Sequence, residues 1–362
     1  MPYLDSNPGS AAMGIAARSG PGTSCVFQRP PWRGPGGLSV GDKTMSVADV
    51  ELAQDSPYAH LSKVAAVIAA ALTLTAALPA VAGTSTPPIV LIVMENHSLS
   101  QITGDPADLP YQNALWSHTA PGVPTEDITN YKQTCLASSG CTQGSMPNYE
   151  ALATGLMQQQ TTGPRAGEDT NPSIFGQLNA AGLTWKAYAE GIPTACSAVT
   201  SYNDPVTDGR YGLGHTPAIL VSDIWGNQAN CKANVTGLPS LAGAALPQFT
   251  FLTPNYCDDM HGLPSGNGFT NCITGSTALE QRSDGWLAAV VPNLVADGAT
   301  VVITYDEGGG SALFTVVAGA GVTNGTSFST ATNHYGLLAG TENALGLSFL
   351  GNAATTPAVP VP

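Results

Sequence analysis

The sequence is poor in charged residues, and poorest in positively charged ones. Only 10% of its 362 residues are charged, and 11 Lys and Arg stand against 25 Asp and Glu, which gives a formal net charge of −14. Proteins that bind nucleic acids neutralise phosphates with clustered basic side chains. We therefore expect no nucleic-acid partner and no basic patch that would hold an anionic membrane surface.

Several short patterns are also missing, and each absence argues against a class of protein. No C-x-x-C occurs, so neither a zinc ribbon nor a thioredoxin-like redox site is indicated. Ser145 lies in "QGSMP" and not in Gly-x-Ser-x-Gly, which disfavours a lipase-type serine hydrolase. The glycines of "DEGGGS", Asp306 to Ser311, precede no Lys, so this segment does not match a P-loop.

The N-terminal part of the chain has the pattern of a leader. Residues 1–44 contain turn-forming residues and no hydrophobic periodicity, so we interpret them as a non-folding extension. Lys63 precedes an apolar run, Val64–Ala82, whose last three residues have the small-x-small pattern of a cleavage site. We interpret residues 45–82 as a signal-peptide region with cleavage after Ala82, and the protein as secreted and extracellular. An uncleaved membrane anchor is the alternative, since the run is just long enough to span a bilayer.

The cysteines fit an exported protein. Six of the seven lie after the leader, and an even number in an oxidising compartment predicts three disulfides. Six cysteines allow many pairings, and we favour neighbours along the chain because each pair then closes a short loop. The expected pairs are Cys135 with Cys141, Cys196 with Cys231, and Cys257 with Cys272.

Apolar runs of strand length alternate with segments at helical spacing from Pro88 onward. The runs "PIVLIVM", "LTWKAYA", "PQFTFLTPN", "ATVVITYDE" and "ALFTVVAG" are continuously apolar, which is typical of strands buried on both faces of a mostly parallel sheet. Between them, "NPSIFGQLNAAG" and "STALEQRSDGWLAAVVPNLVADG" carry apolar residues at helical spacing. We predict one α/β domain over residues 83–362, with a mostly parallel central sheet flanked by helices on both faces.

Three of the predicted strands end in clusters of polar residues. Ligand sites in parallel sheets gather at the carboxyl ends of the strands. Carboxylates that lie close together repel strongly, so a bound cation is the expected reason for their coexistence. The clusters are Glu95-Asn96-His97, Cys257 to His261, and Asp306-Glu307.

A further polar residue, Ser145, precedes a segment of helical character in "GSMPNYEALATG". The start of a helix places a side-chain hydroxyl beside free backbone N–H groups, where a phosphate oxyanion is stabilised. An ordinary helix-capping serine is the alternative interpretation.

Five motifs follow one another along the chain: "VLIVMENHS", "GSMPNYEALATG", "FLTPNYCDDMHG", "VVITYDEGG" and "NHYGLLAGTENALGL". In this order they resemble the bacterial phosphoesterase family of secreted acid phosphatases and non-specific phospholipases C, within the alkaline-phosphatase-like superfamily. The resemblance extends from Pro88 to Leu347 and is closer to the short acid phosphatases than to the larger phospholipases. It implies an alkaline-phosphatase-like fold and a divalent metal ion, Mg, Ca, Mn or Zn.

The resemblance also implies a role for each matching residue. Ser145 matches the nucleophile, and His261 and His334 match catalytic histidines. Asn96 and Asn148 are the implied contacts to the phosphate. The implied metal ligands are Glu95, Asn96, Ser145, Asp259, Asp306 and Glu307.

Two positions depart from the family's pattern. Close relatives often have His-Pro before the nucleophile, where this chain has Gln143-Gly144. The wider superfamily has a second metal-binding histidine where this chain has Glu307, so the number of ions, one or two, stays open. Three other histidines have no role implied by the resemblance, and we expect them to be structural: His97, His118 and His215.

These observations predict a secreted, metal-dependent acid phosphatase that hydrolyses small phosphate monoesters through a phosphoserine intermediate. The alternative is a phospholipase C or other phosphodiesterase of the same family, with a phospholipid or phosphoinositide as substrate. The absence of additional lipid-binding domains weighs against it. A non-catalytic secreted binding protein that keeps the fold is the third hypothesis, and the oligomeric state is not predicted.

Overall fold

The structure is a computed structural model that describes residues 86–135, 144–158, 163–199 and 209–362. The predicted N-terminal extension, signal-peptide region and cleavage position lie outside the described residues, so they stay predictions. Within the described ranges, no helix is both long enough and apolar enough to cross a membrane.

An eight-stranded sheet organises the described chain, in the order β5-β4-β6-β1-β7-β8-β2-β9. Neighbouring strands from β5 to β7 are all parallel, β2 and β9 are parallel to each other, and β8 runs antiparallel to both of its neighbours. The predicted mostly parallel sheet is therefore confirmed. The strands are β1 (Ile89–Met94), β2 (Thr125–Ile128), β4 (Trp185–Ala189), β5 (Val235–Thr236), β6 (Phe249–Thr253), β7 (Thr300–Tyr305), β8 (Thr315–Gly319) and β9 (Thr326–Phe328), with a separate parallel pair, β3 (Tyr131–Lys132) and β10 (Thr332–Asn333).

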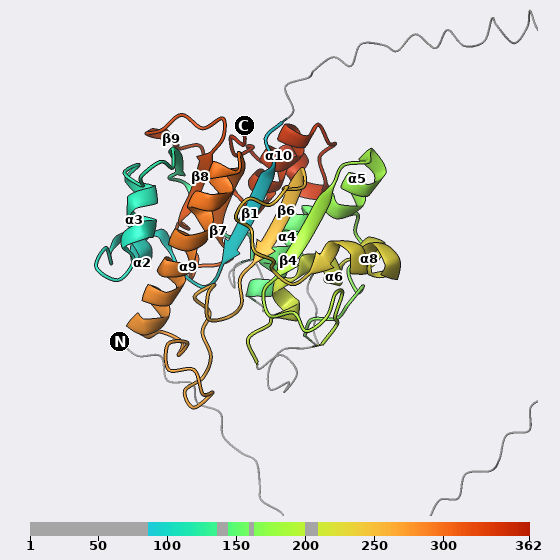
Figure 1. The fold of residues 1–362 in the computed structure, drawn as a ribbon. Coiled ribbons are helices and arrows are strands. Elements are labelled where there is room, and N and C mark those ends of the chain that lie inside the picture. Colours follow the sequence, from blue (N-terminus) through green and yellow to red (C-terminus); the bar gives the residue numbers. More distant parts are fainter. Residues whose placement is uncertain (1–85, 136–143, 159–162, 200–208) are drawn as a thin grey trace, which may run out of the picture. The chain divides into compact units, whose positions relative to one another are not determined.

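The centre of the sheet is fully buried. β6, β1 and β7 lie side by side (Figure 1), with Ile89 of β1 opposite Phe249 and Thr300, and every residue in these strands is buried. Strands covered on both faces have no water-facing side, so their sequences are apolar throughout rather than alternating. The five runs predicted as strands all form strands of this sheet.

Helices pack on both faces of the sheet. Figure 1 shows α9 (Thr277–Ala296) in front of β7 and β8, which it contacts, and α4 (Ser145–Thr154) and α10 (His334–Leu345) behind the sheet. The two predicted helices both form, as α9 and as α5 (Ile174–Ala181), which ends at Gly182 in the left-handed region. The other helices are α2 (Leu99–Thr103), α3 (Pro110–Trp116), α6 (Pro217–Leu220), α7 (Ser222–Trp225), α8 (Gln228–Asn234) and the 3₁₀ helices η2 (Leu213–His215) and η3 (Gly351–Thr355).

Two of the three predicted disulfides are present. Cys196 is bonded to Cys231, and Cys257 is bonded to Cys272. The third predicted pair involves Cys141, which lies outside the described residues. The second bond closes a loop that begins just after β6, so it lies close to the carboxyl ends of the central strands.

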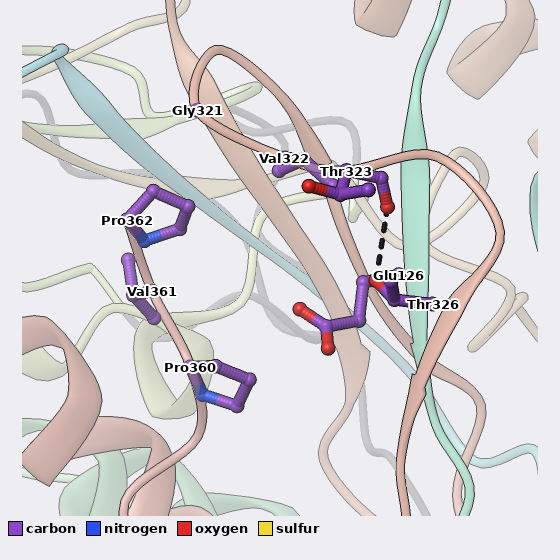
Figure 2. Close-up of a pocket in the computed structure, with 8 residues that line it drawn as sticks. All are labelled: Glu126, Gly321, Val322, Thr323, Thr326, Pro360, Val361 and Pro362. Carbon is purple, nitrogen blue, oxygen red and sulfur yellow. Dashed lines mark hydrogen bonds between the residues drawn. The ribbon is translucent and has the colours of Figure 1, made fainter.

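A pocket of about 330 Å³ opens between the segment around β9 and the last residues of the chain (Figure 2). None of the described residues that line it belongs to the predicted site, so this hollow and the polar strand ends are different places. The lining residues are Glu126, Gly321, Val322, Thr323, Thr326, Pro360, Val361 and Pro362.

Candidate active site

The carboxyl ends of the three central strands bring three acidic side chains together. Glu95 directly follows β1, Asp306 directly follows β7, and Asp259 lies in the turn after β6. All three are fully buried. The backbone N–H of Asn96 donates to Asp306 Oδ1 over 3.0 Å, which ties the ends of β1 and β7 to each other. The predicted convergence of carboxylates from separate strands is confirmed.

The residues after Glu95 and Asp259 both adopt a left-handed backbone. The φ angle is 60° at Asn96 and 78° at Met260. Asparagine tolerates this region, whereas a residue such as methionine is strained there by about 1–3 kcal/mol. The thioether of Met260 accepts a hydrogen bond from the Tyr305 hydroxyl over 3.0 Å, and this contact helps to hold the strained turn. Each left-handed residue turns the chain immediately after an acid and keeps that carboxylate at the strand end.

The three carboxylates strongly disfavour one another's charge. Burial raises the pKa of Glu95 and of Asp259 well above their usual values, and the neighbouring acids raise them further. Burial, followed by the charge of Glu307, raises the pKa of Asp306 to about 7. Among the described residues, no Lys or Arg forms an ion pair with these acids. The site therefore concentrates negative charge that only protons or a bound cation can neutralise.

Ser145 is the first residue of α4, and its hydroxyl reaches into this cluster. Ser145 Oγ donates to Glu95 Oε2 over 3.0 Å. The residue that caps the helix is Gly144, so the hydroxyl of Ser145 is not used for capping. The alternative interpretation of Ser145 as an ordinary capping serine is therefore wrong.

His215 lies between two of the carboxylates. Its Nε2 is 3.1 Å from Glu95 Oε1, and its Nδ1 is 3.4 Å from Asp259 Oδ2. We expected a structural role because His215 ends no predicted strand and matches no motif. The structure corrects this, since the short helix η2 carries the residue into the site from outside the sheet. Its position depends on tertiary packing, so the sequence contains no signal for it.

The donor set of this site fits a divalent cation. Apart from the His215 ring, no described hydrogen-bond donor reaches Glu95 Oε1, Asp259 Oδ2 or Asp306 Oδ2, although all three atoms are buried. Burial lowers the pKa of His215 well below its usual value, so the neutral ring offers one N–H to two carboxylates. Ligand atoms of Glu95, His215 and His261 lie within 4.8 Å of one another. Carboxylate oxygens suit Mg, Ca or Mn, and imidazole nitrogens admit Zn.

Glu307 packs against the residue that precedes Ser145. A side chain on Gly144 would overlap the Glu307 carboxylate, which would have to shift to make room for it. Burial raises the pKa of Glu307, and its charge acts on Glu95 and Asp306. The chain departs from the family's pattern at Gly144 and at Glu307, and these two residues are in contact. The small residue Gly144 makes room for the additional acid, Glu307.

The family of the chain follows from a comparison with protein families. The model of the Phosphoesterase family matches residues 135–348. The chain belongs to the phosphoesterase family. It is accordingly a hydrolase of this family, and the predicted class of enzyme is confirmed.

Named relatives of this phosphoesterase are between a quarter and a third identical to it over the aligned residues. It is 28% identical over 282 residues to the phosphatidylinositol-3-phosphatase of Mycobacterium tuberculosis, a match that covers 75% of this chain and 81% of the relative. It is 27% identical over 191 residues to an acid phosphatase of Aspergillus fumigatus, covering 49% of this chain and 40% of that protein. A solved alkaline phosphatase superfamily protein from Vibrio parahaemolyticus matches with a TM-score of 0.45 and 12% identity, over 73% of this chain and 67% of the other.

His334 contacts the backbone of one of the three site acids in this phosphoesterase. Its Nε2 donates to the carbonyl oxygen of Asp306 over 2.6 Å, and its Nδ1 accepts from the Tyr131 hydroxyl over 2.7 Å. Burial lowers the pKa of His334 to about 4, so the ring is neutral. Both nitrogens are engaged, and the geometry does not support the direct catalytic role predicted for His334. It positions Asp306 instead.

Asn148 also differs from its predicted role as a phosphate contact. Its Oδ1 accepts from the backbone N–H groups of Thr134 and Cys135, and its Nδ2 donates to the carbonyl oxygen of Gly144 over 2.9 Å. The side chain is fully buried and bonded to the protein backbone. Asn148 therefore fixes the chain just before Ser145.

The two remaining histidines expected to be structural lie outside the carboxylate cluster. His97 Nδ1 bonds to the Glu95 carbonyl oxygen over 2.9 Å, and His118 Nε2 is 3.0 Å from Asp127 Oδ1. These contacts fit the structural role expected for both.

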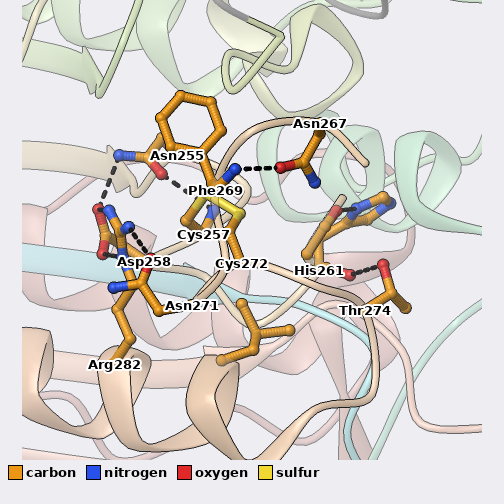
Figure 3. The surroundings of a disulfide bond; sticks show 12 residues. Asn255, Cys257, Asp258, His261, Asn267, Phe269, Asn271, Cys272, Thr274 and Arg282 are labelled. Carbon is orange, nitrogen blue, oxygen red and sulfur yellow. Dashed lines mark hydrogen bonds and ion pairs between the residues drawn. A yellow bond between two sulfur atoms is a disulfide. The ribbon is translucent and has the colours of Figure 1, made fainter. Parts of the chain in front are cut away.

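The turn that carries Asp259 and His261 is braced from two sides (Figure 3). On one side Arg282 of α9 forms an ion pair with Asp258, with Nε 2.7 Å from Oδ1. On the other side the Cys257–Cys272 disulfide closes the loop, and Thr274 Oγ1 donates to the His261 carbonyl oxygen over 3.1 Å. The brace limits how far the two site residues can move relative to the sheet.

Proposed function

We propose that this phosphoesterase is a secreted, metal-dependent acid phosphatase that hydrolyses phosphate monoesters through a phosphoserine intermediate. The observation that carries the proposal is the hydrogen bond from Ser145 Oγ to Glu95 Oε2, made among buried carboxylates whose remaining oxygens meet no donor of the described residues other than the His215 ring. Metal-assisted phosphoryl transfer to serine requires a nucleophilic hydroxyl beside an anionic cluster that can bind a cation.

The predicted ligands are the residues that would hold the ion. Glu95, Asp259 and Asp306 supply the buried oxygens. His215, which was not among the predicted ligands, lies beside them and is an additional ligand in this proposal. When bound, a divalent ion polarises a phosphoryl oxygen and favours the serine alkoxide. Further oxygen and amide donors surround this core: Asn96, Ser145 and Glu307.

The chain's own groups supply the proton transfers. The Ser145 proton moves to Glu95 Oε2 along the existing hydrogen bond as Oγ bonds to phosphorus and the ester oxygen leaves. His261 Nδ1 donates to the Gly262 carbonyl oxygen over 2.7 Å, which leaves Nε2 as the atom that can take a proton. In the second step a water loses a proton to this nitrogen, its oxygen bonds to phosphorus, and the Oγ–P bond breaks as Glu95 returns its proton to Oγ.

The name of the mycobacterial relative suggests one class of substrate. That protein is a phosphatidylinositol-3-phosphatase, so a phosphoinositide monoester is a candidate beside small soluble monoesters. Both present a terminal phosphate to the same groups. A diester would place a second bulky group where those groups must stabilise an equatorial oxygen.

The test compares an aryl phosphate monoester with the matching choline diester, with and without chelator. We expect kcat/KM for the monoester to be at least about 10-fold higher, which corresponds to about 1.4 kcal/mol in the transition state, with an optimum below pH 7 and loss of activity in chelator. Equal or faster turnover of the diester would replace the proposal by the phospholipase C alternative.

A further inference from the structure

Tyr149 is a buried residue of the site to which the proposed reaction assigns no part. It lies on α4 four residues after Ser145, and residues with this spacing share one face of a helix. Its side chain is fully buried and packs near Phe251 of β6, with ring centroids 6.3 Å apart. The helix that carries the nucleophile therefore also directs an aromatic ring and a hydroxyl towards the carboxylate cluster.

The ring of Tyr149 stacks on the ring of His215. The two planes differ by 6°, and the centroids are 5.0 Å apart. Tyr256 and His261 meet the same imidazole edge-on, at 5.0 and 5.6 Å. The orientation of the imidazole plane decides where its two nitrogens point, and η2 is too short to fix it alone. The Tyr149 ring lies nearly parallel to the imidazole, so it restricts tilting of this plane.

The hydroxyl of Tyr149 has an unmet hydrogen-bonding capacity. It lies beside the Glu95 carboxylate but makes no well-formed hydrogen bond with the described residues. A buried hydroxyl without a partner costs about 1–3 kcal/mol. An ordinary phenol is protonated at neutral pH, so the Tyr149 hydroxyl can donate a hydrogen bond to that acid.

We propose that Tyr149 is a positioning residue of this phosphoesterase: its ring fixes the plane of the His215 imidazole, and its hydroxyl donates to Glu95 in the assembled site. This inference rests on the proposed function, because it assigns Glu95 and His215 to the catalytic cluster. It also states which part of the tyrosine does what, so single substitutions can separate the two roles.

The test uses two variants of Tyr149 and one matched control. Y149F keeps the ring and removes the hydroxyl, and Y149L removes both. The control is Y111F, because the Tyr111 hydroxyl is also buried and meets no hydrogen-bond partner among the described residues, but belongs to α3, outside the site. Each variant is assayed with an aryl phosphate monoester, and its thermal midpoint is measured alongside.

We expect kcat to fall about 10-fold in Y149F and about 100-fold in Y149L, with KM within about twofold, as is typical when a residue supporting metal ligands is lost. Y111F should keep the wild-type kcat. Equal kcat in Y149F and Y111F would overturn the role of the hydroxyl, and equal kcat in Y149L and Y149F would overturn the role of the ring. If Y149L does not fold, Y149M replaces it.

Two readouts do not depend on turnover. The ring protons of His215 should keep their ring-current shift in NMR spectra of Y149F and lose it in Y149L. Affinity for Mg²⁺, Mn²⁺ and Zn²⁺, measured by calorimetry, should fall in Y149L by about 10- to 100-fold and stay unchanged in Y111F. A wild-type protein that hydrolyses no monoester would refute the proposed function, whereas an unchanged NMR shift in Y149L would refute only this inference.

Discussion

The amide nitrogen of Glu95 donates a hydrogen bond of 2.8 Å to the carbonyl oxygen of Asp259. This bond continues the pairing of β1 and β6 beyond the last strand residues, into the turns that carry the acids. The two carboxylates are thus held close by backbone structure, although their charges repel. Pre-organisation of this kind lets a site bind a cation tightly, since the protein has already met the energetic cost of gathering its ligands.

Replacing Ser145 by alanine should abolish turnover without unfolding the protein. The covalent route loses its nucleophile, so we expect kcat to fall by at least about 10³-fold. Steady-state kinetics and a thermal melt measure the two effects. Incubation of the wild-type protein with substrate, followed by acid quench and mass spectrometry, should show phosphate on Ser145. Activity within a few-fold of wild type in S145A would remove this residue from the nucleophilic role.

The stability of the metal-free protein should depend on pH through its buried acids. Burial raises the pKa of Asp306 to about 7 in the folded state, against about 4 in an unfolded chain. The folded protein binds this proton more tightly, so the free energy of unfolding should be highest below about pH 4 and fall as the pH rises towards 7. Glu95 and Asp259 shift in the same direction. Denaturation in EDTA across this range tests the slope, and saturating divalent ion should flatten it.

Asp306→Asn should have opposite effects on the metal-free and the metal-loaded protein. Without metal, the substitution removes one of the repelling charges and should raise the thermal midpoint. With metal, it removes a ligand and should weaken ion affinity and make activity depend on added ion. Glu126→Gln, which changes an acid in the pocket of Figure 2, is the control. Full activity of D306N in chelator would contradict the metal site.

Gly144→Ala should reduce activity through Glu307. The added methyl group overlaps the Glu307 carboxylate and must displace it from the site. We expect kcat to fall about 10-fold, the lower end of the range for displaced supporting groups. Gly285→Ala is the control, because the position on α9 has open space and the change should leave kcat unaltered. If G144A and G144A/E307A lose activity to the same extent as E307A alone, both effects act through the same carboxylate; additive losses would argue against this.

The disulfides should contribute differently to stability and to function. Removing Cys257–Cys272 by a double serine substitution should lower the thermal midpoint and also kcat, because this bond braces the turn with Asp259 and His261. Removing Cys196–Cys231 should lower the thermal midpoint with little change in kcat. Titration of the native protein should find no free thiol at these four cysteines. A normal kcat without the first bond would show that the brace is dispensable.

The sequence predicted the centre of the fold and the acids of the site, because both depend on the same local signal. Continuously apolar runs identify buried parallel strands, and the residues after such strands must meet at one edge. Asp259, Glu95 and Asp306 were found in this way. The short strands β2, β5 and β9 were not predicted, since two to four residues carry too little hydrophobic pattern to separate them from loops.

The remaining differences concern residues whose roles depend on tertiary partners. His215 enters from η2, where the sequence shows neither a strand end nor a motif. His334 and Asn148 lie where the motifs place them, but their hydrogen bonds go to the backbone of Asp306 and Gly144. Residue type and spacing indicate that such side chains belong to a site. They do not show whether the polar atoms face the substrate or the protein.

The hydrogen bond between Asn96 and Asp306 joins residues 210 positions apart, and it crosses the pair of strands at the centre of the sheet. During synthesis, Glu95 and Ser145 leave the ribosome long before the strand that completes their surroundings. Contacts this distant in sequence form slowly, and chains that await them expose apolar strand edges. Under the proposed mechanism, a nascent or truncated chain therefore contains Ser145 without the acid that follows β7. On that mechanism we expect hydrolytic activity only when β7 docks, which would make turnover itself a sensitive reporter of completed folding.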